Sequence, residues 1–219
     1  MLTLSDELFL LSLEDKKNGV GFSRSFELPY AMAGAVLLEL SLMGKIRLEG
    51  KRVIMLNATP TGSELLNELL AKIADARKPR KIADWVGIFG EKAKLLTRSA
   101  LADLVGHGIL RSEEKSFLWV IPYTGYREQD SSAKYALKVH LRGVVLGNEK
   151  IDEHAAALLS LGRAAGLLDH LFTRDELRQA QRQVDALVKD EAVGQAVQEA
   201  IDAVNAAVAA SVMVATTSG

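Results

Sequence analysis

Apolar residues recur every three or four positions along most of the chain, a spacing that predicts helices rather than strands. Thr3 followed by Asp6 or Glu7 is a capping signal, so the first helix is expected to begin there and to end at residues 16–19. Pro29 suits the first turn of the second helix, and Gly44 suits its end. The later helices are expected at 29–43, from 63 to the break at 77, around 85, and at 94–105, 133–146, 152–172, 173–189 and 191–215, with a mobile loop at 19–26.

Two β-hairpins are predicted where apolar and polar residues alternate. Residues 46–48 and 53–55 alternate around Gly50, and residues 109–111 and 117–121 are expected to form the second pair. Each hairpin follows a helix that ends at a glycine, which indicates reuse of one supersecondary unit inside a single core. The copies match at an offset of 64 residues: Leu37, Leu40, Gly44, Ile46 and Lys51 fall on Leu101, Leu104, Gly108, Leu110 and Lys115.

The composition is typical of a globular protein and limits the kinds of partner that it can bind. Of 219 residues, 48% are hydrophobic and 25% are charged, which is not typical of a disordered chain. The net charge of −1 excludes a broad electrostatic field, so binding to a membrane or to nucleic acid would require a local basic patch. The absence of cysteine excludes disulfides, thiol catalysis and zinc–thiolate sites, and suits a reducing cytoplasm.

No membrane span, signal peptide or domain boundary is expected. Glu199, Asp202 and Asn205 interrupt the Ala/Val-rich end of the chain, so a buried core helix explains it better than a transmembrane one. The first residues lack the basic start of a signal peptide, which favours a cytoplasmic location. The only linker-like stretch, residues 123–132, is short, so we expect one domain over residues 1–219.

The sequence carries no recognisable catalytic motif. The four histidines lie far apart and none belongs to an HExxH pair: His107, His140, His154 and His170. Asp152 and Glu153 are better explained as the start of a helix, where acids interact favourably with the positive end of the dipole. Neither a glycine-rich phosphate loop nor a GxSxG elbow is present. We therefore predict no catalytic residue, no metal site and no cofactor.

Four motifs, taken in order, resemble those of one known family. They are Leu2-Thr3-Leu4 with Asp6-Glu7-Leu8 and Leu10-Leu11; Gly34 with Leu37-Leu38-Glu39-Leu40, Leu42, Gly44, Ile46 and Leu48; Pro60-Thr61-Gly62 before Leu65-Leu66; and Arg98 with Leu101, Leu104-Val105 and Gly108-Ile109-Leu110. In this order and at these separations they are similar to the Golgi phosphoprotein 3-like family. The similarity runs from Leu2 to the terminal helix.

The resemblance implies a mainly α fold: a single domain with a central helix bundle surrounded by amphipathic helices, to which the two predicted hairpins are added. It also implies binding to phosphatidylinositol 4-phosphate-like or other anionic phospholipid head groups. In eukaryotic members it implies retention of Golgi glycosyltransferases by their cytoplasmic tails. The chain is similar to the short, bacterial-type members, because the fold is expected to begin at Leu2. We therefore expect a peripheral membrane protein on the inner face of a membrane that acts as an adaptor for membrane proteins.

The same resemblance points to a head-group site. Lys134, Lys138 and Arg142 are spaced by four residues, so they share one face of a helix, and ammonium and guanidinium groups suit phosphate. Arg24 is the cation of the loop in which the family carries a pocket tryptophan, and it is the expected fourth contact. Because that tryptophan is absent, and because Ala33 stands where the family has an arginine, the sequence does not specify which lipid is bound.

A denser cationic run spans residues 77–81. Pro79 interrupts it, so an exposed loop is predicted, with nonspecific attraction to an anionic membrane of about 1 kcal/mol per charge. Such a loop must be ordered at an entropic cost before its charges converge. The helical stripe is therefore expected to carry more of the lipid affinity than this run.

Two other functions stay open at this stage. A helix followed by a helix and a hairpin, occurring twice, is also the arrangement of winged-helix DNA-binding domains. The helix at 29–43 has no lysine or arginine, which argues against nucleic acid. A protein-binding scaffold is equally compatible, as is a homo-oligomer. The apolar segment 155–161 suits membrane contact or a core helix, and Trp85 and Trp119 are interpreted as core or hairpin packing.

Overall fold

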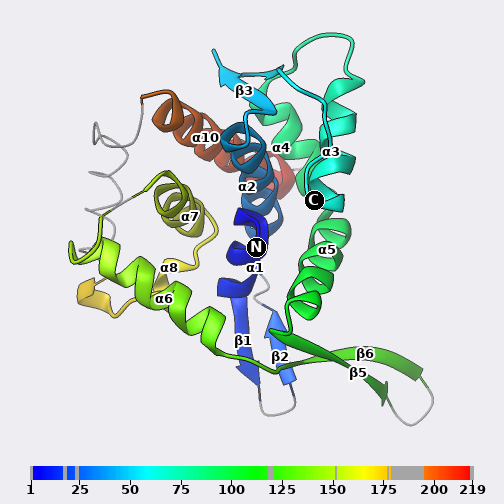
Figure 1. Cartoon of the computed structure of the whole chain (residues 1–219), viewed down its shortest axis with the longest axis vertical. Coiled ribbons are helices and arrows are strands. Elements are labelled where there is room, and N and C mark those ends of the chain that lie inside the picture. The colour runs from blue at the N-terminus through cyan, green and yellow to red at the C-terminus, as the bar shows by residue number, and fades with distance from the viewer. Residues whose placement is uncertain are drawn as a thin grey trace.

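The helix α2 (Leu28–Leu42) lies in the middle of the molecule. In the computed structural model it packs against α1 (Leu4–Ser12), α4 (Ile82–Gly90), α7 (Glu153–Ala164) and α10 (Gln195–Thr217), as Figure 1 shows. A helix that is apolar on all sides must be enclosed, and Glu39 is the one charged residue of α2. The predicted mainly α fold with a central helix bundle is confirmed. The structure describes residues 2–16, 19–22, 25–117, 121–150, 152–176, 178 and 195–217.

The N-terminal segment departs from the sequence prediction after Ser12. The helix α1 opens with the expected capping box, in which the Asp6 N–H donates to Thr3 Oγ1 and the Thr3 N–H donates to Asp6 Oδ2. It ends at Ser12 rather than at 16–19, and β1 (Leu13–Lys16) pairs with β2 (Gly19–Phe22) where a mobile loop was predicted. Lys16 pairs with Gly19, and the helical spacing of the apolar residues before them concealed this hairpin.

The other two sheets are also two-stranded antiparallel hairpins. The first, β3 (Ile46–Glu49) with β4 (Arg52–Met55), agrees with the prediction. The second, β5 (Leu110–Phe117) with β6 (Ile121–Glu128), differs from the predicted pairing of 109–111 with 117–121. Leu110 pairs with Glu128, and Phe117 belongs to β5 and pairs with Ile121, so most of the expected linker at 123–132 is strand. Pro122 and Gly125 give β6 the composition of a loop. They are tolerated because each strand of a two-stranded sheet has an unpaired edge.

The repeated unit found in the sequence is also a structural repeat. The helix α2 precedes β3, as α5 (Ala93–Gly106) precedes β5. Gly44 and Gly108 close these helices with φ angles of 66° and 71°, in the left-handed region that favours glycine. The two closing hydrogen bonds are equivalent: Lys45 N–H to Leu40 O at 2.8 Å, and Ile109 N–H to Leu104 O at 2.9 Å. The first copy cannot read DNA, because α2 is enclosed and cannot enter a groove.

Two helices near the middle of the chain agree with their predictions. The helix α3 (Glu64–Ala74) begins after Ser63, whose Oγ accepts the Leu66 N–H at 3.4 Å. The helix α4 contains Trp85, which is 4% exposed and therefore belongs to the core, as expected. Trp119 lies outside the described residues. The cationic run at 77–81 connects α3 to α4.

The C-terminal helices settle one open alternative. The segment 155–161 is fully buried within α7, so it is core and does not reach a membrane. The expected single helix at 152–172 is divided into α7 and α8 (Leu168–Leu171), because Gly166 turns the chain with a φ of 68°. The next predicted helix, at 173–189, lies mostly outside the described residues, but its capping box between Thr173 and Glu176 is present.

The helix α10 is part of the core, as its apolar spacing predicts. Ile201, Val204 and Val208 are buried. A Cβ atom added to Gly34 of α2 would lie 2.6 Å from Val204 Cγ1, so the two helices approach closely only because residue 34 is glycine. Within the described parts of the chain, no helix combines the length and the apolar character that crossing a bilayer requires.

Candidate functional site

The predicted cationic stripe lies on α6 (Ser132–Val145), but its first member is buried. Lys134 is 6% exposed, and its Nζ donates to the Leu13 carbonyl at 2.8 Å, at the C-terminal end of α1. A cation at this position satisfies a carbonyl that the helix leaves unpaired and faces the negative end of the dipole. Of the three cations predicted to share one face of this helix, Lys134 is therefore directed into the protein rather than to solvent. The physical reason is that α6 packs against α1 near Lys134.

Arg142, near the other end of α6, is held by an acid that is distant in sequence. Its Nε and Nη2 donate to Glu176 Oε1 at 2.8 and 2.6 Å, and Nη2 also donates to Oε2 at 2.7 Å. The Thr173 N–H donates to the same carboxylate at 2.9 Å. This backbone hydrogen bond, followed by that from Arg142, lowers the pKa of Glu176 to about 2. The carboxylate is therefore ionised at physiological pH and occupies the fork of the guanidinium.

Of the remaining predicted site residues, the described part of the chain contains only Lys138. Lys138 is half-buried between the two ends of α6. His140, its neighbour on the helix, has Nδ1 at 2.6 Å from Glu149 Oε2. Arg24 lies outside the described residues, so its distance to α6 is not defined. Figure 1 shows α6 extending from the region of β1 toward α8, with Lys134 at its β1 end.

Two ionisable groups near α1 have raised pKa values: the half-buried His154 and the buried Asp6. His154 Nε2 lies 2.6 Å from Glu7 Oε2, which joins α7 to α1, and this hydrogen bond outweighs burial and raises the pKa of His154. Burial likewise raises the pKa of Asp6. Among the described residues no three histidine, aspartate or glutamate side chains gather as candidate metal ligands. These groups connect helices and do not form a recognisable reaction centre.

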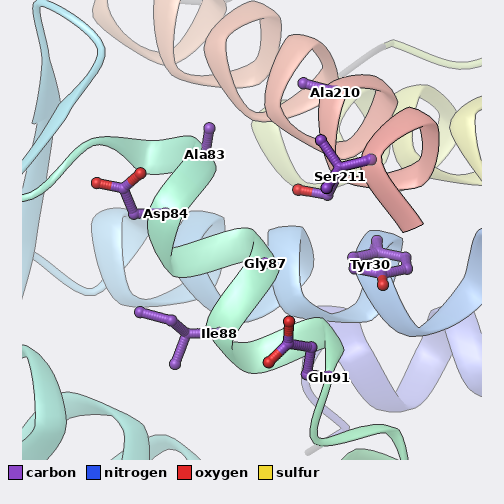
Figure 2. A pocket seen from close by; sticks show the side chains of 9 residues that line it. Tyr30, Ala83, Asp84, Gly87, Ile88, Glu91, Ala210 and Ser211 are labelled. Carbon is purple, nitrogen blue, oxygen red and sulfur yellow. The ribbon is translucent and has the colours of Figure 1, made fainter. Parts of the chain in front are cut away.

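A groove of about 540 Å³ lies between α2, α4 and the end of α10. Its lining is mainly apolar, with Tyr30 from α2 and Ser211 from α10, and Asp84 and Glu91 on α4 add carboxylates (Figure 2). A Cβ atom on Gly90 would overlap the Tyr30 ring, so this glycine lets α4 and α2 meet beside the groove. Sequence reasoning missed this feature. The pair of glycines in α4, at 87 and 90, was the available signal for close helix packing.

The cationic run at 77–81 is more ordered than its sequence suggests. The Val53 N–H donates to the Arg80 carbonyl at 3.0 Å, and the Ile82 N–H donates to the Lys51 carbonyl at 2.9 Å. Arg52 Nη1 also donates to the Pro79 carbonyl at 2.9 Å. The loop is therefore fixed to the β3–β4 hairpin by its backbone, while the side chains of residues 77, 78, 80 and 81 are exposed. The predicted exposure is confirmed.

Comparison with known proteins gives one family and a curated relative. Residues 4–204 match the family model described as Golgi phosphoprotein 3 (GPP34). The chain is also 29% identical over 166 residues to the Vacuolar protein sorting-associated protein 74 of Eremothecium gossypii, a match that covers 66% of this chain and 49% of the relative. It thus spans about half the length of this curated relative. Because the family match extends from α1 into α10, this chain belongs to the Golgi phosphoprotein 3 (GPP34) family.

Proposed function

We propose that this protein is a peripheral membrane protein that binds the anionic head groups of phospholipids, phosphoinositides among them, and acts by binding rather than by catalysis. The observation that carries the proposal is the family match over residues 4–204. A location on the cytoplasmic face of a membrane follows from the same proposal. The protein would reach the surface by charge and local contacts, since its net charge of −1 provides no long-range attraction.

Within this proposal, Lys138 and Arg142 are the residues of α6 that contact the head group, together with Arg24. Lys134 has a different role, because its ammonium group is already bound to the Leu13 carbonyl. The fork of Arg142 supports the assignment: it holds a carboxylate by two nitrogens, and a phosphate is bound by the same bidentate geometry. A head group would therefore replace Glu176 at Arg142.

Flotation of the purified full-length protein with vesicles tests this function. We expect binding to vesicles that contain phosphatidylserine or phosphatidylinositol 4-phosphate, little binding to pure phosphatidylcholine, and a decrease in binding as salt rises. Equal binding to phosphatidylcholine vesicles would contradict the proposal. So would tight binding to duplex DNA with none to anionic vesicles, which is the outcome that the winged-helix alternative requires.

We further propose that the adaptor role uses the groove between α2, α4 and α10. Cytoplasmic segments next to transmembrane helices are rich in lysine and arginine. Such a segment would place apolar side chains beside Tyr30 and its cations beside Asp84 and Glu91. This charge complementarity is the observation that favours a protein partner at this groove.

A binding assay with synthetic peptides from the cytoplasmic ends of membrane proteins tests the groove. We expect Glu91→Lys to weaken the binding of basic peptides because it reverses the charge at one edge. Asp169→Lys is the matched control, since it reverses an exposed acid on α8, away from the groove. Equal effects of the two substitutions would exclude the groove as the binding site and would leave the membrane proposal unaffected.

A further inference from the structure

A second, smaller hollow lies where β4 and the loop between α3 and α4 meet Trp85. Its volume is about 210 Å³, which is below the roughly 300–1,000 Å³ of pockets that hold drug-sized ligands. Arg77, Lys78 and Arg80 contribute to its lining, and no acidic side chain of the described residues does. The size and the charge of the hollow both suit a small anion.

Trp85 contributes to the lining of the hollow. Trp85 is more than nine-tenths buried, and its indole Nε1–H donates no hydrogen bond to any described residue. An indole nitrogen can only donate, and a buried donor without an acceptor is unfavourable. The indole nitrogen has almost no accessible surface, so the contacts to an anion come from the exposed cations, and the Trp85 indole lies close enough to report on them.

The three cations of the lining lie around the hollow. The guanidinium carbon of Arg80 lies 5.4 Å from the centroid of the Trp85 ring, which places its charge beside the indole. Arg77 and Lys78 are exposed at the same hollow. Unlike Arg142, none of these three side chains forms an ion pair with another described residue. Their charges are thus available to an external anion.

The backbone of the loop is already in position. Its attachments to the β3–β4 hairpin, through the Arg80, Lys51 and Pro79 carbonyls, fix the segment that carries the cations. Binding to a prepared site avoids most of the entropic cost of ordering a loop. The loop is therefore a better anion site than its proline-interrupted sequence suggests.

We propose that this hollow binds a phosphate group, with Arg77 and Arg80 as cationic contacts beside Trp85. Guanidinium groups match the planar oxygen pairs of phosphate. The ligand is a phosphomonoester, carried by a lipid head group or by a soluble phosphate. This site shares no residue with α6, so it can be tested independently of the head-group contacts proposed there.

Nuclear magnetic resonance of the 15N-labelled full-length protein tests the site directly. The chain has two tryptophans and hence two indole N–H signals, and Trp85→Phe identifies which one belongs to Trp85. We expect inorganic phosphate, added at constant ionic strength, to shift the Trp85 signal in a saturable way. The double substitution Arg77→Gln with Arg80→Gln should weaken this titration about tenfold. Lys94→Gln with Arg98→Gln, which removes two exposed cations from α5, is the matched control.

The source of the phosphate is then separated by two further probes. The deacylated head group of phosphatidylinositol 4-phosphate should saturate the Trp85 signal at lower concentration than inorganic phosphate if a lipid is the ligand, and at a similar concentration if a soluble phosphate is. A shift no larger than that caused by chloride, or one unchanged in the arginine double variant, overturns the site. Vesicle flotation without any Trp85 shift refutes this site alone, whereas a saturable shift without flotation refutes membrane binding alone.

Discussion

The helix α6 and the loop between α3 and α4 are both cationic, but they use their charges in opposite ways. On α6, Lys134 is bound to the Leu13 carbonyl and Arg142 to Glu176, so the side chains attach the helix to its neighbours. On the loop, the backbone makes the attachments to the β3–β4 hairpin, and the side chains of Arg77 and Arg80 are exposed. The regular stripe thus marks internal contacts, while the irregular run presents its charge to solvent.

This difference reverses the expected ranking of the two surfaces by their contribution to anion binding. Spacing along a helix determines which residues share a face, but it does not determine what covers that face. The sequence favours the stripe because a rigid helix keeps its cations together. The structure favours the loop, because the hairpin has already ordered it and its cations are not neutralised by described acids. We therefore expect the loop to contribute more to anion binding in the unmodified protein.

The largest expected effect comes from Lys134→Met, which removes a buried donor. We expect the free energy of unfolding to fall by about 1–3 kcal/mol, because the Leu13 carbonyl loses its partner inside the protein. Thermal unfolding should move down by several degrees, as circular dichroism can measure. Arg80→Gln, the control on the loop, should change stability by less than about 0.5 kcal/mol. Similar values for the two would mean that Lys134 is exposed in solution.

Charge reversal compares the two surfaces in lipid binding. The double substitution Arg77→Glu with Arg80→Glu should weaken flotation with anionic vesicles at least about thirtyfold at low salt, since the loss of two nearby cations costs about 2 kcal/mol and the new acids repel the surface. Lys138→Glu with Arg142→Glu should have a smaller effect, because Glu176 already neutralises Arg142. Lys94→Glu with Arg98→Glu controls for the change in net charge. A larger loss of vesicle binding from the α6 pair than from the loop pair would show that α6 is the main lipid-binding surface.

Removing the acid that binds Arg142 should increase the contribution of α6 to lipid binding. Glu176→Gln removes the negative charge from the fork, so Arg142 can bind a phosphate instead. We expect binding to phosphoinositide vesicles to increase by a few-fold, and the increase to disappear when Arg142→Gln is added. If Glu176→Gln leaves vesicle binding unchanged, Arg142 does not contact the head group.

The smallest expected effect is a decrease in stability at low pH, through Glu176. The folded pKa of Glu176, about 2, lies below its ordinary value of 4.5. Its contribution to stability is therefore complete above about pH 4.5 and is lost as the pH falls toward 2. Carboxyl carbon signals, followed by nuclear magnetic resonance across this range, should show the low midpoint. Arg142→Gln should raise it only in part, since the Thr173 N–H remains. A midpoint near 4.5 in the unmodified protein would show that the fork is open in solution.

Much of the fold could be predicted because local physics determines it. The capping boxes at Thr3 and Thr173, the glycine closures at 44 and 108 and the apolar face of α10 each depend on neighbouring residues. For the same reason, the repeat and the four family motifs were readable from the chain alone. The errors arose where two local preferences conflict. Strand pairing of residues 13–16 with 19–22 replaced the expected end of a helix, and strand pairing in β6 overcame the preference of Pro122 and Gly125 for a loop.

The candidate sites depended instead on contacts between distant residues. The sequence placed Lys134 and Arg142 on one helical face. Only the tertiary structure shows that Lys134 binds the Leu13 carbonyl at the end of α1 and that Arg142 binds Glu176. Only the β3–β4 hairpin decided that the loop at 77–81 is ordered beside Trp85. Periodicity describes one element at a time. The partner of a charge is decided by which elements meet, and that is a property of the tertiary structure.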